Sequence, residues 1–217
     1  MTDISDEAPR VDPSTEIERR AIGWIAPFSQ ALHLERARDW VVRLDPDASL
    51  ELRLAAVTHD IERMFPGGPV FNRATGRWDD PDYLYAHGRR SAEVVGVWVH
   101  ENSDAADGLA RAELRRLITL HEFGGLEGAD LLQAADSLSF LETLQDVVRS
   151  WVITGECGIG QARAKHQYMV DRIRVPEASR LAVPLLKAAM ASLDDLESVE
   201  PDDAIASGLA GTSRRTS

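Results

Sequence analysis

The sequence predicts an all-α fold, an irregular helical bundle, and three observations support this class. Apolar residues recur at helical spacing over most of the chain, no segment shows the convincing alternation of a strand, and Gly and Pro cluster between the helical segments. The 217 residues are 44% hydrophobic and 28% charged, which is typical of a globular protein. A chain of this length suffices for one domain with a sizeable core.

Caps and breakers place the individual helices. Thr15 followed by Glu18 is a capping box that opens the first helix. A second helix is expected at about 30–43, and a third begins near Ser49 and ends before the Pro66-Gly67-Gly68-Pro69 breaker. Further helices are expected at about 82–100, 105–121, 127–150, 160–174 and 176–196.

Three segments lack helical periodicity. Residues 66–81 are rich in Gly, Pro, Asn and Asp, and loops of that length inside compact domains are often functional lids. Residues 1–13 and 198–217 are polar and poor in large apolar groups, so they cannot bury enough surface to offset the entropy of ordering. We therefore expect disordered tails at 1–13 and 198–217 and a single helical domain at 14–197.

Charge and cysteine content limit the partners of the protein. A net charge of -12 and a pI near 4.9 argue against nucleic-acid polymers and membranes as partners, because phosphate groups are held by clustered Lys and Arg. The acidic N-terminus lacks the apolar run of a secretory signal, and the single cysteine, Cys157, excludes an intramolecular disulfide, so we expect a cytoplasmic protein. A small anionic substrate stays compatible with this charge if a bound metal supplies local positive charge. The sequence indicates no oligomeric state.

Residues of the metal-ligand type occur on five successive predicted helices. The dipeptide His59-Asp60 follows the apolar run LRLAAVT, and His33 lies on the preceding helix. His87 lies at the start of a helix, His121 ends another, and a carboxylate at Asp136 interrupts the apolar sequence LLQAADSLSF. Imidazole and carboxylate side chains together suit Zn, Fe, Mn or Co.

Each of these residues also has an interpretation without a metal. A single histidine such as His33 is more often an interior residue with satisfied hydrogen bonds, and Asp136 could cap a helix. Burying an unpaired carboxylate is costly, however, and no Lys or Arg lies between Arg116 and Arg149 to pair locally with Asp136. One shared metal centre explains the five helices better than five independent causes.

The order of these ligand-type residues resembles the HD-domain superfamily of metal-dependent phosphohydrolases, in its six-ligand form, over about residues 30–140. The resemblance implies an HD-type bundle with one or two divalent ions, of Mn, Fe, Co, Mg or Zn. It implies a first ion held by His33, His59, Asp60 and Asp136. It implies a second ion held by His87, His121 and the bridging Asp60. The implied activity is hydrolysis of a small phosphorylated metabolite or nucleotide, with a metal-activated hydroxide attacking phosphorus.

Basic and aromatic side chains near the ligands are candidates for binding the substrate. Many HD hydrolases carry a basic residue shortly after the dipeptide, and Arg63 fits this position one helical turn after Asp60; it either clamps a phosphate oxygen or pairs with a nearby acid. Asp60 and Arg63 are therefore the candidate catalytic residues. Lys165 and Tyr168 share one face of a basic helix, which points either at the site or at solvent. Arg89, shortly after the third ligand helix begins, is a further candidate.

Two other functions stay open within the same resemblance. Some HD-fold proteins bind two irons with the same ligand order and act as oxygenases. A metal-binding signalling or interaction module without catalysis is the third class. His100 and His166 are not required by any of these schemes.

Overall fold

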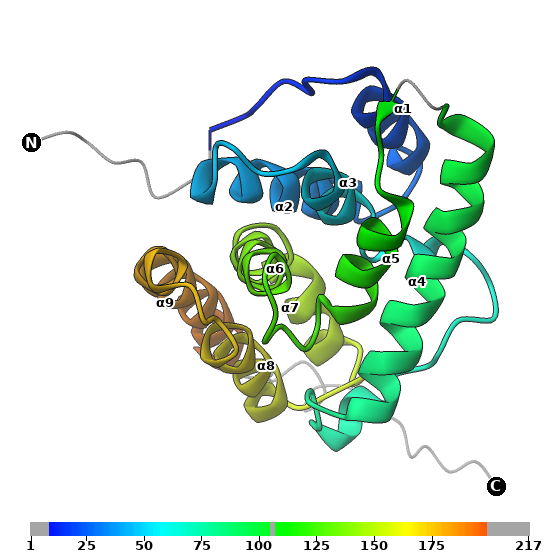
Figure 1. Cartoon of the computed structure of the whole chain (residues 1–217). Coiled ribbons are helices and arrows are strands. Elements are labelled where there is room, and N and C mark those ends of the chain that lie inside the picture. The colour runs from blue at the N-terminus through cyan, green and yellow to red at the C-terminus, as the bar shows by residue number, and fades with distance from the viewer. Residues whose placement is uncertain (1–8, 105–106, 199–217) are drawn as a thin grey trace, which may run out of the picture.

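The computed structural model describes residues 9–104 and 107–198, and this part of the chain is all-helical, without strands (Figure 1). The predicted all-α class is therefore confirmed. The α-helices are α1 (Glu16–Ile25), α2 (Ala31–Leu44), α3 (Leu50–Thr58), α4 (Pro81–Asn102), α5 (Arg111–Leu120), α6 (Ala129–Thr143), α7 (Gln145–Ile153), α8 (Ile159–Asp171) and α9 (Pro176–Ser198). Two short 3-10 helices, η1 (Ile61–Met64) and η2 (Arg73–Thr75), lie between α3 and α4.

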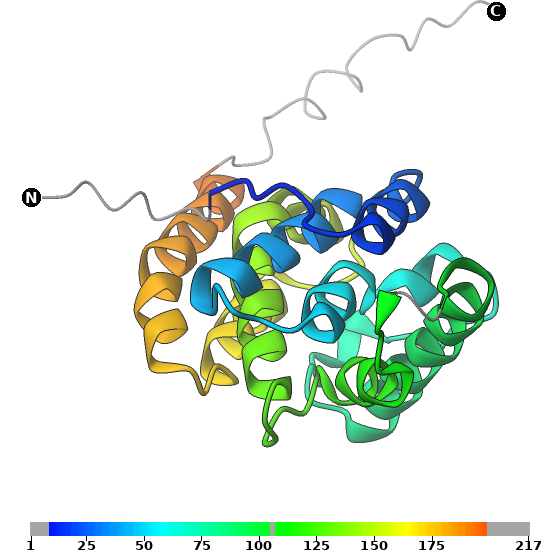
Figure 2. The same ribbon diagram turned by 45° about the horizontal axis from the view of Figure 1, so that its top comes forward.

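Helix α6 lies at the centre of the bundle (Figures 1 and 2). It packs against α2 on one side and against α8 and α9 on the other, and it also contacts α3, α5 and α7. Its sequence ADLLQAADSLSFLET is small or apolar around most of its circumference, as expected of a helix that is covered on all sides. A polar side chain on α6 therefore faces the interior of the protein, and this applies to Asp136.

Two predicted helix starts are confirmed by their caps, whereas the helix expected from about residue 105 begins at Arg111. The backbone N–H of Glu18 donates to the Thr15 hydroxyl at 3.3 Å, and the Glu18 carboxylate accepts from the Thr15 backbone N–H at 3.2 Å. The Ser49 hydroxyl accepts from the N–H of Leu52 at 3.2 Å and caps α3. These side chains satisfy N–H groups that have no partner within the helix.

Two predicted helices end earlier than expected. The helix that begins near Ser49 ends at Thr58, and Asp60 has φ -103° and ψ 8°, outside the α-helical region, before η1 begins. The predicted helix at 127–150 is interrupted at Leu144, whose φ of -107° and ψ of 15° separate α6 from α7. Because α3 ends before Asp60, Asp60 lies on a turn, and the α-helical backbone does not determine the direction of its side chain.

Two apolar clusters stabilise the bundle. The larger one surrounds Trp40 and Leu138 and joins α1 to α6 with α9. The smaller one contains Phe140, Leu144 and Met169 and lies between α6, α7, α8 and α9. Cys157 belongs to the smaller cluster and is buried.

The ends of the described chain differ in part from the predicted tails. The Arg38 guanidinium donates to the carbonyl oxygens of Val11 and Asp12 at 2.8 and 3.1 Å, so residues 11–12 are held against α2. Residues 1–8 and 199–217 of the predicted tails lie outside the described residues. Of the helices described, none combines the length and the apolar character needed to cross a membrane.

Candidate metal centre

The predicted ligands lie together in the interior, and three of them form a first group. His33 on α2, His59 at the end of α3 and Asp136 on α6 are all buried. The Nε2 atoms of His33 and His59 lie 3.2 and 3.3 Å from Asp136 Oδ1. The packing of α6 against α2 and α3 therefore joins residues that are more than 70 positions apart in the sequence.

A second group lies beside the first. His87 on α4 places Nε2 at 2.7 Å from Asp60 Oδ1, and His121 at the end of α5 places Nε2 at 3.7 Å from the same oxygen. The Nε2 atom of His59, in the first group, is 3.9 Å from this oxygen. Asp60 therefore lies between the two groups, in the position of a shared ligand.

The separations suit atoms that bind a common ion. Two ligand atoms at about 2.0–2.2 Å from one metal ion lie roughly 3–4 Å apart, depending on the angle between them. The distances from Asp136 Oδ1 to His33 and His59, and from Asp60 Oδ1 to His121, fall in this range. The contact between His87 and Asp60 is shorter and is a hydrogen bond.

Two of the histidines, His59 and His121, direct their Nε2 atoms at the centre. Nδ1 of His59 lies 2.9 Å from the Ala56 carbonyl oxygen, and Nδ1 of His121 lies 2.7 Å from that of Ile118. A carbonyl oxygen only accepts, so Nδ1 carries a proton, and in the neutral form of each ring Nε2 presents its lone pair. Both Nε2 atoms are buried and make no hydrogen bond with any described residue, which fits a metal as their partner.

The other two histidines also have a hydrogen-bond partner at Nδ1. The Ser139 hydroxyl donates to the His33 carbonyl at 2.6 Å, so its oxygen is left to accept from His33 Nδ1 at 2.9 Å. His87 Nδ1 donates to the Glu62 carboxylate at 2.9 Å. A fixed Nδ1 partner is the usual means by which proteins orient a metal-binding imidazole.

Two arginines neutralise the carboxylates of the centre. Arg63 on η1 donates from Nε to Asp60 Oδ2 at 2.8 Å. Arg172, at the end of α8, donates to both Asp136 and Glu122. No Lys or Arg lies close to Asp136 in the sequence, but the end of α8 brings Arg172 to it across the bundle. Charge balance alone therefore does not require a metal.

The pKa values agree with this arrangement. Burial raises the pKa of the Asp136 and Asp60 carboxyls, but Arg172 and His59 outweigh it at Asp136, and Arg63 and His87 outweigh it at Asp60, so both pKa values lie well below the usual range. Burial lowers the pKa of His121 to about 4. At neutral pH the acids are thus ionised and His121 is neutral, the forms that bind metal ions.

The pKa of His59 is raised, whereas that of His121 is lowered. Burial lowers the pKa of His59, but the negative charges of Asp136 and Asp60 more than reverse this and raise the pKa to about 9. Binding of a cation would therefore displace a proton from this ring.

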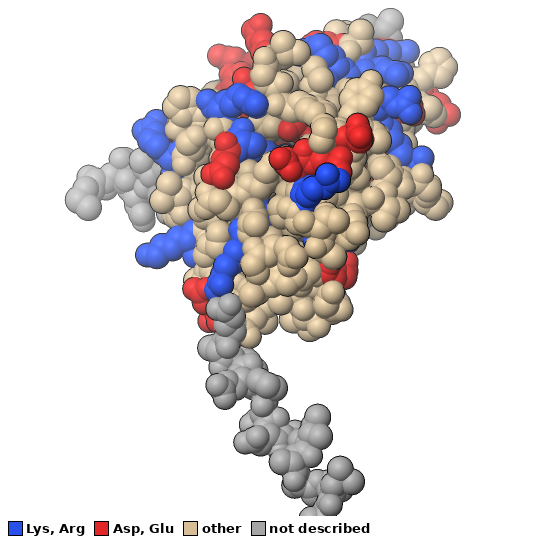
Figure 3. Space-filling view, turned by 90° about the horizontal axis from the view of Figure 1, so that it is seen from below, with Lys and Arg blue, Asp and Glu red and all other residues tan. Residues whose placement is uncertain are grey.

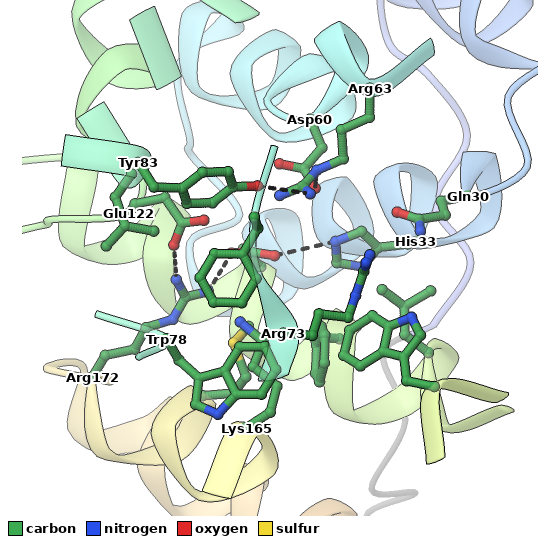
Figure 4. A pocket seen from close by; sticks show the side chains of 17 residues that line it. Gln30, His33, Asp60, Arg63, Arg73, Trp78, Tyr83, Glu122, Lys165 and Arg172 are labelled. Atoms are coloured by element: carbon green, nitrogen blue, oxygen red, sulfur yellow. Dashed lines mark hydrogen bonds and ion pairs between the residues drawn. The ribbon is translucent and has the colours of Figure 1, made fainter. Parts of the chain in front are cut away.

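Three of the predicted ligands line a cavity, and Figure 4 shows two of them, His33 and Asp60. Asp60, Asp136 and His33 line it from the bundle interior, and Phe71 and Trp78 line it from the loop between η1 and α4. This loop is the predicted lid segment. An ion pair of 2.9 Å between Arg73 and Glu156 joins η2 to the segment between α7 and α8. A hydrogen bond of 3.2 Å from Gln161 to the Ala74 carbonyl joins it to α8.

The predicted substrate-binding residues divide into two sets. Arg63 and Lys165 line the cavity, and the Lys165 Nζ lies 5.1 Å from the ring centroids of Phe140 and Tyr168. Tyr168 packs beside Lys165 without being among the described residues that line the cavity. Burial lowers the pKa of Lys165 to about 8.

Arg89, the further candidate for substrate binding, is not among the described residues that line the cavity. Its side chain is 62% exposed and faces Glu93 at 3.6 Å. Two residues along a helix correspond to a rotation of about 200°, so Arg89 points away from the interior that His87 faces. On the face seen in Figure 3, Lys and Arg side chains are likewise dispersed, several with acidic neighbours.

Residues of the centre that the sequence did not predict are mostly partners of ligands. Glu62 and Ser139 orient His87 and His33, and Arg172 and Glu122 form a buried ion pair at the cavity. One local signal exists for Glu122, because it directly follows His121 as Asp60 follows His59. For Arg172 the sequence gives only its place seven residues after Lys165 on the same predicted helix face, and its partners are 36 and 50 residues away.

The described residues thus contain buried histidine and carboxylate groups that could hold metal ions. Compared with protein-family models, curated proteins and solved structures, the chain shows no match.

Proposed function

We propose that the protein is a metal-dependent phosphohydrolase of the HD-domain type, which acts on a small phosphorylated metabolite or nucleotide in the cytoplasm. One observation carries the proposal. Histidine Nε2 atoms and aspartate oxygens from five parts of the bundle converge in the interior, and His33, Asp60 and Asp136 among them line a cavity that also contains cationic side chains. The order of these ligands along the chain is the order that the HD-domain superfamily uses.

The residues fit one or two divalent ions. The first would be held by His33, His59 and Asp136, the second by His87 and His121, with Asp60 shared between them. Bound ions would supply Lewis acidity for phosphoryl oxygens and would lower the pKa of water to near neutrality.

The cationic side chains support an anionic substrate. Arg63, Arg73 and Lys165 line the cavity although the chain as a whole has a net charge of -12. Arg63 donates from Nε to Asp60 and from one terminal nitrogen to the Tyr83 hydroxyl at 3.2 Å, and this holds its guanidinium at the cavity. From this position it would hold a phosphoryl oxygen, and Lys165 would add a second positive charge.

The aromatic walls support catalysis in a water-poor space. Phe71 stacks on Trp78 with ring centroids 5.0 Å apart, and Trp78 stacks on Trp151 at 6.1 Å. An apolar wall beside the charges strengthens their interaction with an anion, because less water screens it.

The test is release of inorganic phosphate from a panel of phosphate esters and nucleotides, with Mn, Co, Mg or Fe added. Metal content and oxygen consumption are measured on the same samples. We expect phosphate release that depends on a divalent ion and is abolished by a chelator. Iron-dependent oxygen consumption without phosphate release would instead indicate the di-iron oxygenase class. Bound metal with neither activity would indicate a signalling or interaction module.

A further inference from the structure

The dipeptide His121-Glu122 repeats the geometry of His59-Asp60. Each histidine follows the last residue of a short helix, with φ and ψ of -56° and -34° at His59 and of -57° and -33° at His121. Each donates from Nδ1 to the carbonyl three residues earlier. The helices α3 and α5 pack together, and the two imidazole rings lie 4.9 Å apart. The acidic residue that follows each histidine, Asp60 or Glu122, lines the cavity.

Glu122 also matches Asp136 in how it is held. The Arg172 guanidinium donates one terminal nitrogen to Asp136 Oδ2 and the other to Glu122 Oε2. The remaining oxygen of each carboxylate faces histidines: Asp136 Oδ1 is 3.2 Å from His33, and Glu122 Oε1 is 3.8 Å from His121. Arg172 therefore leaves one oxygen of each carboxylate to face a ligand group, and Figure 4 shows the interaction of Arg172 with Glu122.

We propose that Glu122 is a ligand of the second ion, together with His87, His121 and the shared Asp60. This inference rests on the proposed metal centre and extends its ligand set. The ligand atoms of His87, His121 and Glu122 lie within 4.8 Å of one another, and all three residues are buried. Each ion would then have two imidazoles and one carboxylate of its own, with Asp60 common to both.

A different role for Glu122 would be to hold Arg172 in place for Asp136. Burial raises the pKa of the Glu122 carboxyl, but Arg172 outweighs it and lowers the pKa to about 2, so the acid is ionised in either role. The two roles differ in what happens when Arg172 is removed. If Glu122 is a ligand, the second ion stays bound when Arg172 is replaced. If Glu122 acts only through Arg172, replacing either residue has the same effect on the second ion.

The experiment is a titration of the metal-free protein with Mn²⁺ and Co²⁺, in the wild type and in the variants Glu122→Gln and Arg172→Met. The readouts are the number of bound ions, the affinity of each ion and the visible absorption of the Co²⁺ protein. Glu113→Gln is the matched control, because Glu113 lies on α5, the helix that precedes Glu122, has a side chain that is 41% exposed and pairs with Arg116. Circular dichroism checks the fold of each variant.

We expect two ions in the wild type and in the control. Glu122→Gln should weaken the second ion by at least about 100-fold and change the Co²⁺ spectrum, while the first ion stays within a few-fold, since even indirect partners of ligands are worth 10–100-fold. Arg172→Met removes an indirect partner of Asp136 and Glu122, so both ions should still bind, and the second ion should be weakened less than in Glu122→Gln. If Glu122→Gln does not fold, Glu122→Asp takes its place, with a weaker second ion expected.

Three results would overturn the role of Glu122. The variant at this position could bind both ions with wild-type affinity, or Arg172→Met could lose the second ion to the same degree as Glu122→Gln. The wild type could also bind one ion only, which leaves a one-metal hydrolase intact. A wild type that binds no ion would contradict the metal centre itself and the proposed function with it.

Discussion

At the residue scale, Asp60 is the carboxylate that both ligand groups share. Its Oδ1 faces the second group and its Oδ2 accepts from Arg63. In Asp60→Asn the side chain keeps its size but loses the charge, so we expect loss of bound metal and a fall in phosphate release of at least about 100-fold. Elemental analysis and a phosphate assay check this. The control is Glu93→Gln, a side chain that is 51% exposed, and loss of metal in this control would point to a nonspecific effect.

Lys165 predicts a pH dependence for anion binding. Its pKa of about 8 means that the amine is charged at pH 7 and loses its charge as the pH rises through 8. We expect inorganic phosphate to inhibit less strongly above pH 8, and Lys165→Met to bind phosphate on the order of 10-fold more weakly at pH 7, the worth of a charged hydrogen bond. The inhibition constant of phosphate, measured between pH 7 and pH 9.5, checks both.

The control for this prediction is Arg89→Met, because Arg89 is exposed and pairs with Glu93. An unchanged pH profile in Lys165→Met would contradict the role of Lys165.

The contribution of Lys165 to stability changes with pH in the opposite direction to its contribution to anion binding. The folded protein binds fewer protons than the unfolded chain between about pH 8 and the ordinary lysine value of 10.5, so the contribution of Lys165 to the free energy of unfolding rises with pH there.

At the scale of elements, the close approach of α4 and α5 brings His87 to His121. Gly88 permits this approach, since a Cβ atom at this position would lie 2.7 Å from the Thr119 backbone oxygen. Gly88→Ala must push the two helices apart. We expect a loss of about 1–3 kcal/mol in the free energy of unfolding, as for other overpacked sites, and a weaker second ion. Chemical denaturation and metal titration check the two effects.

Gly96 on the same helix is the matched control. A Cβ atom there would meet only the end of the Arg115 side chain, at 3.2 Å. Because alanine favours a helix interior over glycine by up to about 1 kcal/mol, Gly96→Ala should be neutral or stabilising. Equal destabilisation by both substitutions would show that the helix contact at Gly88 is not special.

At the scale of the whole molecule, the arginines allow the protein to fold without metal. The buried acids Asp136, Glu122 and Asp60 already have Arg172 and Arg63 as partners. Ions should therefore add stability by mass action rather than be required for folding, by about 2.7 kcal/mol at a concentration 100 times the Kd.

For a chain of this size that gain corresponds to roughly 5–10 °C in Tm. We expect Mn²⁺ to raise the Tm by this amount and a chelator to reverse it, in a thermal melt followed by circular dichroism. Asp60→Asn should show no such response. A wild-type Tm that is indifferent to both the ion and the chelator would contradict the centre.

Much of the fold and part of the site could be predicted from the sequence because they depend on local patterns. Caps such as Thr15 and Ser49 act on the next few residues, and helical periodicity reports which face is buried. The early end of α3 and the interruption at Leu144 could not be predicted in this way. The chain around both positions contains no Gly or Pro that would end a helix, and packing against other helices decided where it turns.

The sequence by itself determined that the chain is helical and which residues are of the ligand type, and it placed those residues on separate helices. Only the tertiary structure decided that Arg172 neutralises Asp136, that Glu122 faces His121, and that Arg89 points to solvent. The physical reason is range. Residue type and helix period act over a few positions, whereas contacts between α6, α8 and the ends of α3 and α5 join positions far apart, and side-chain direction across them follows from packing.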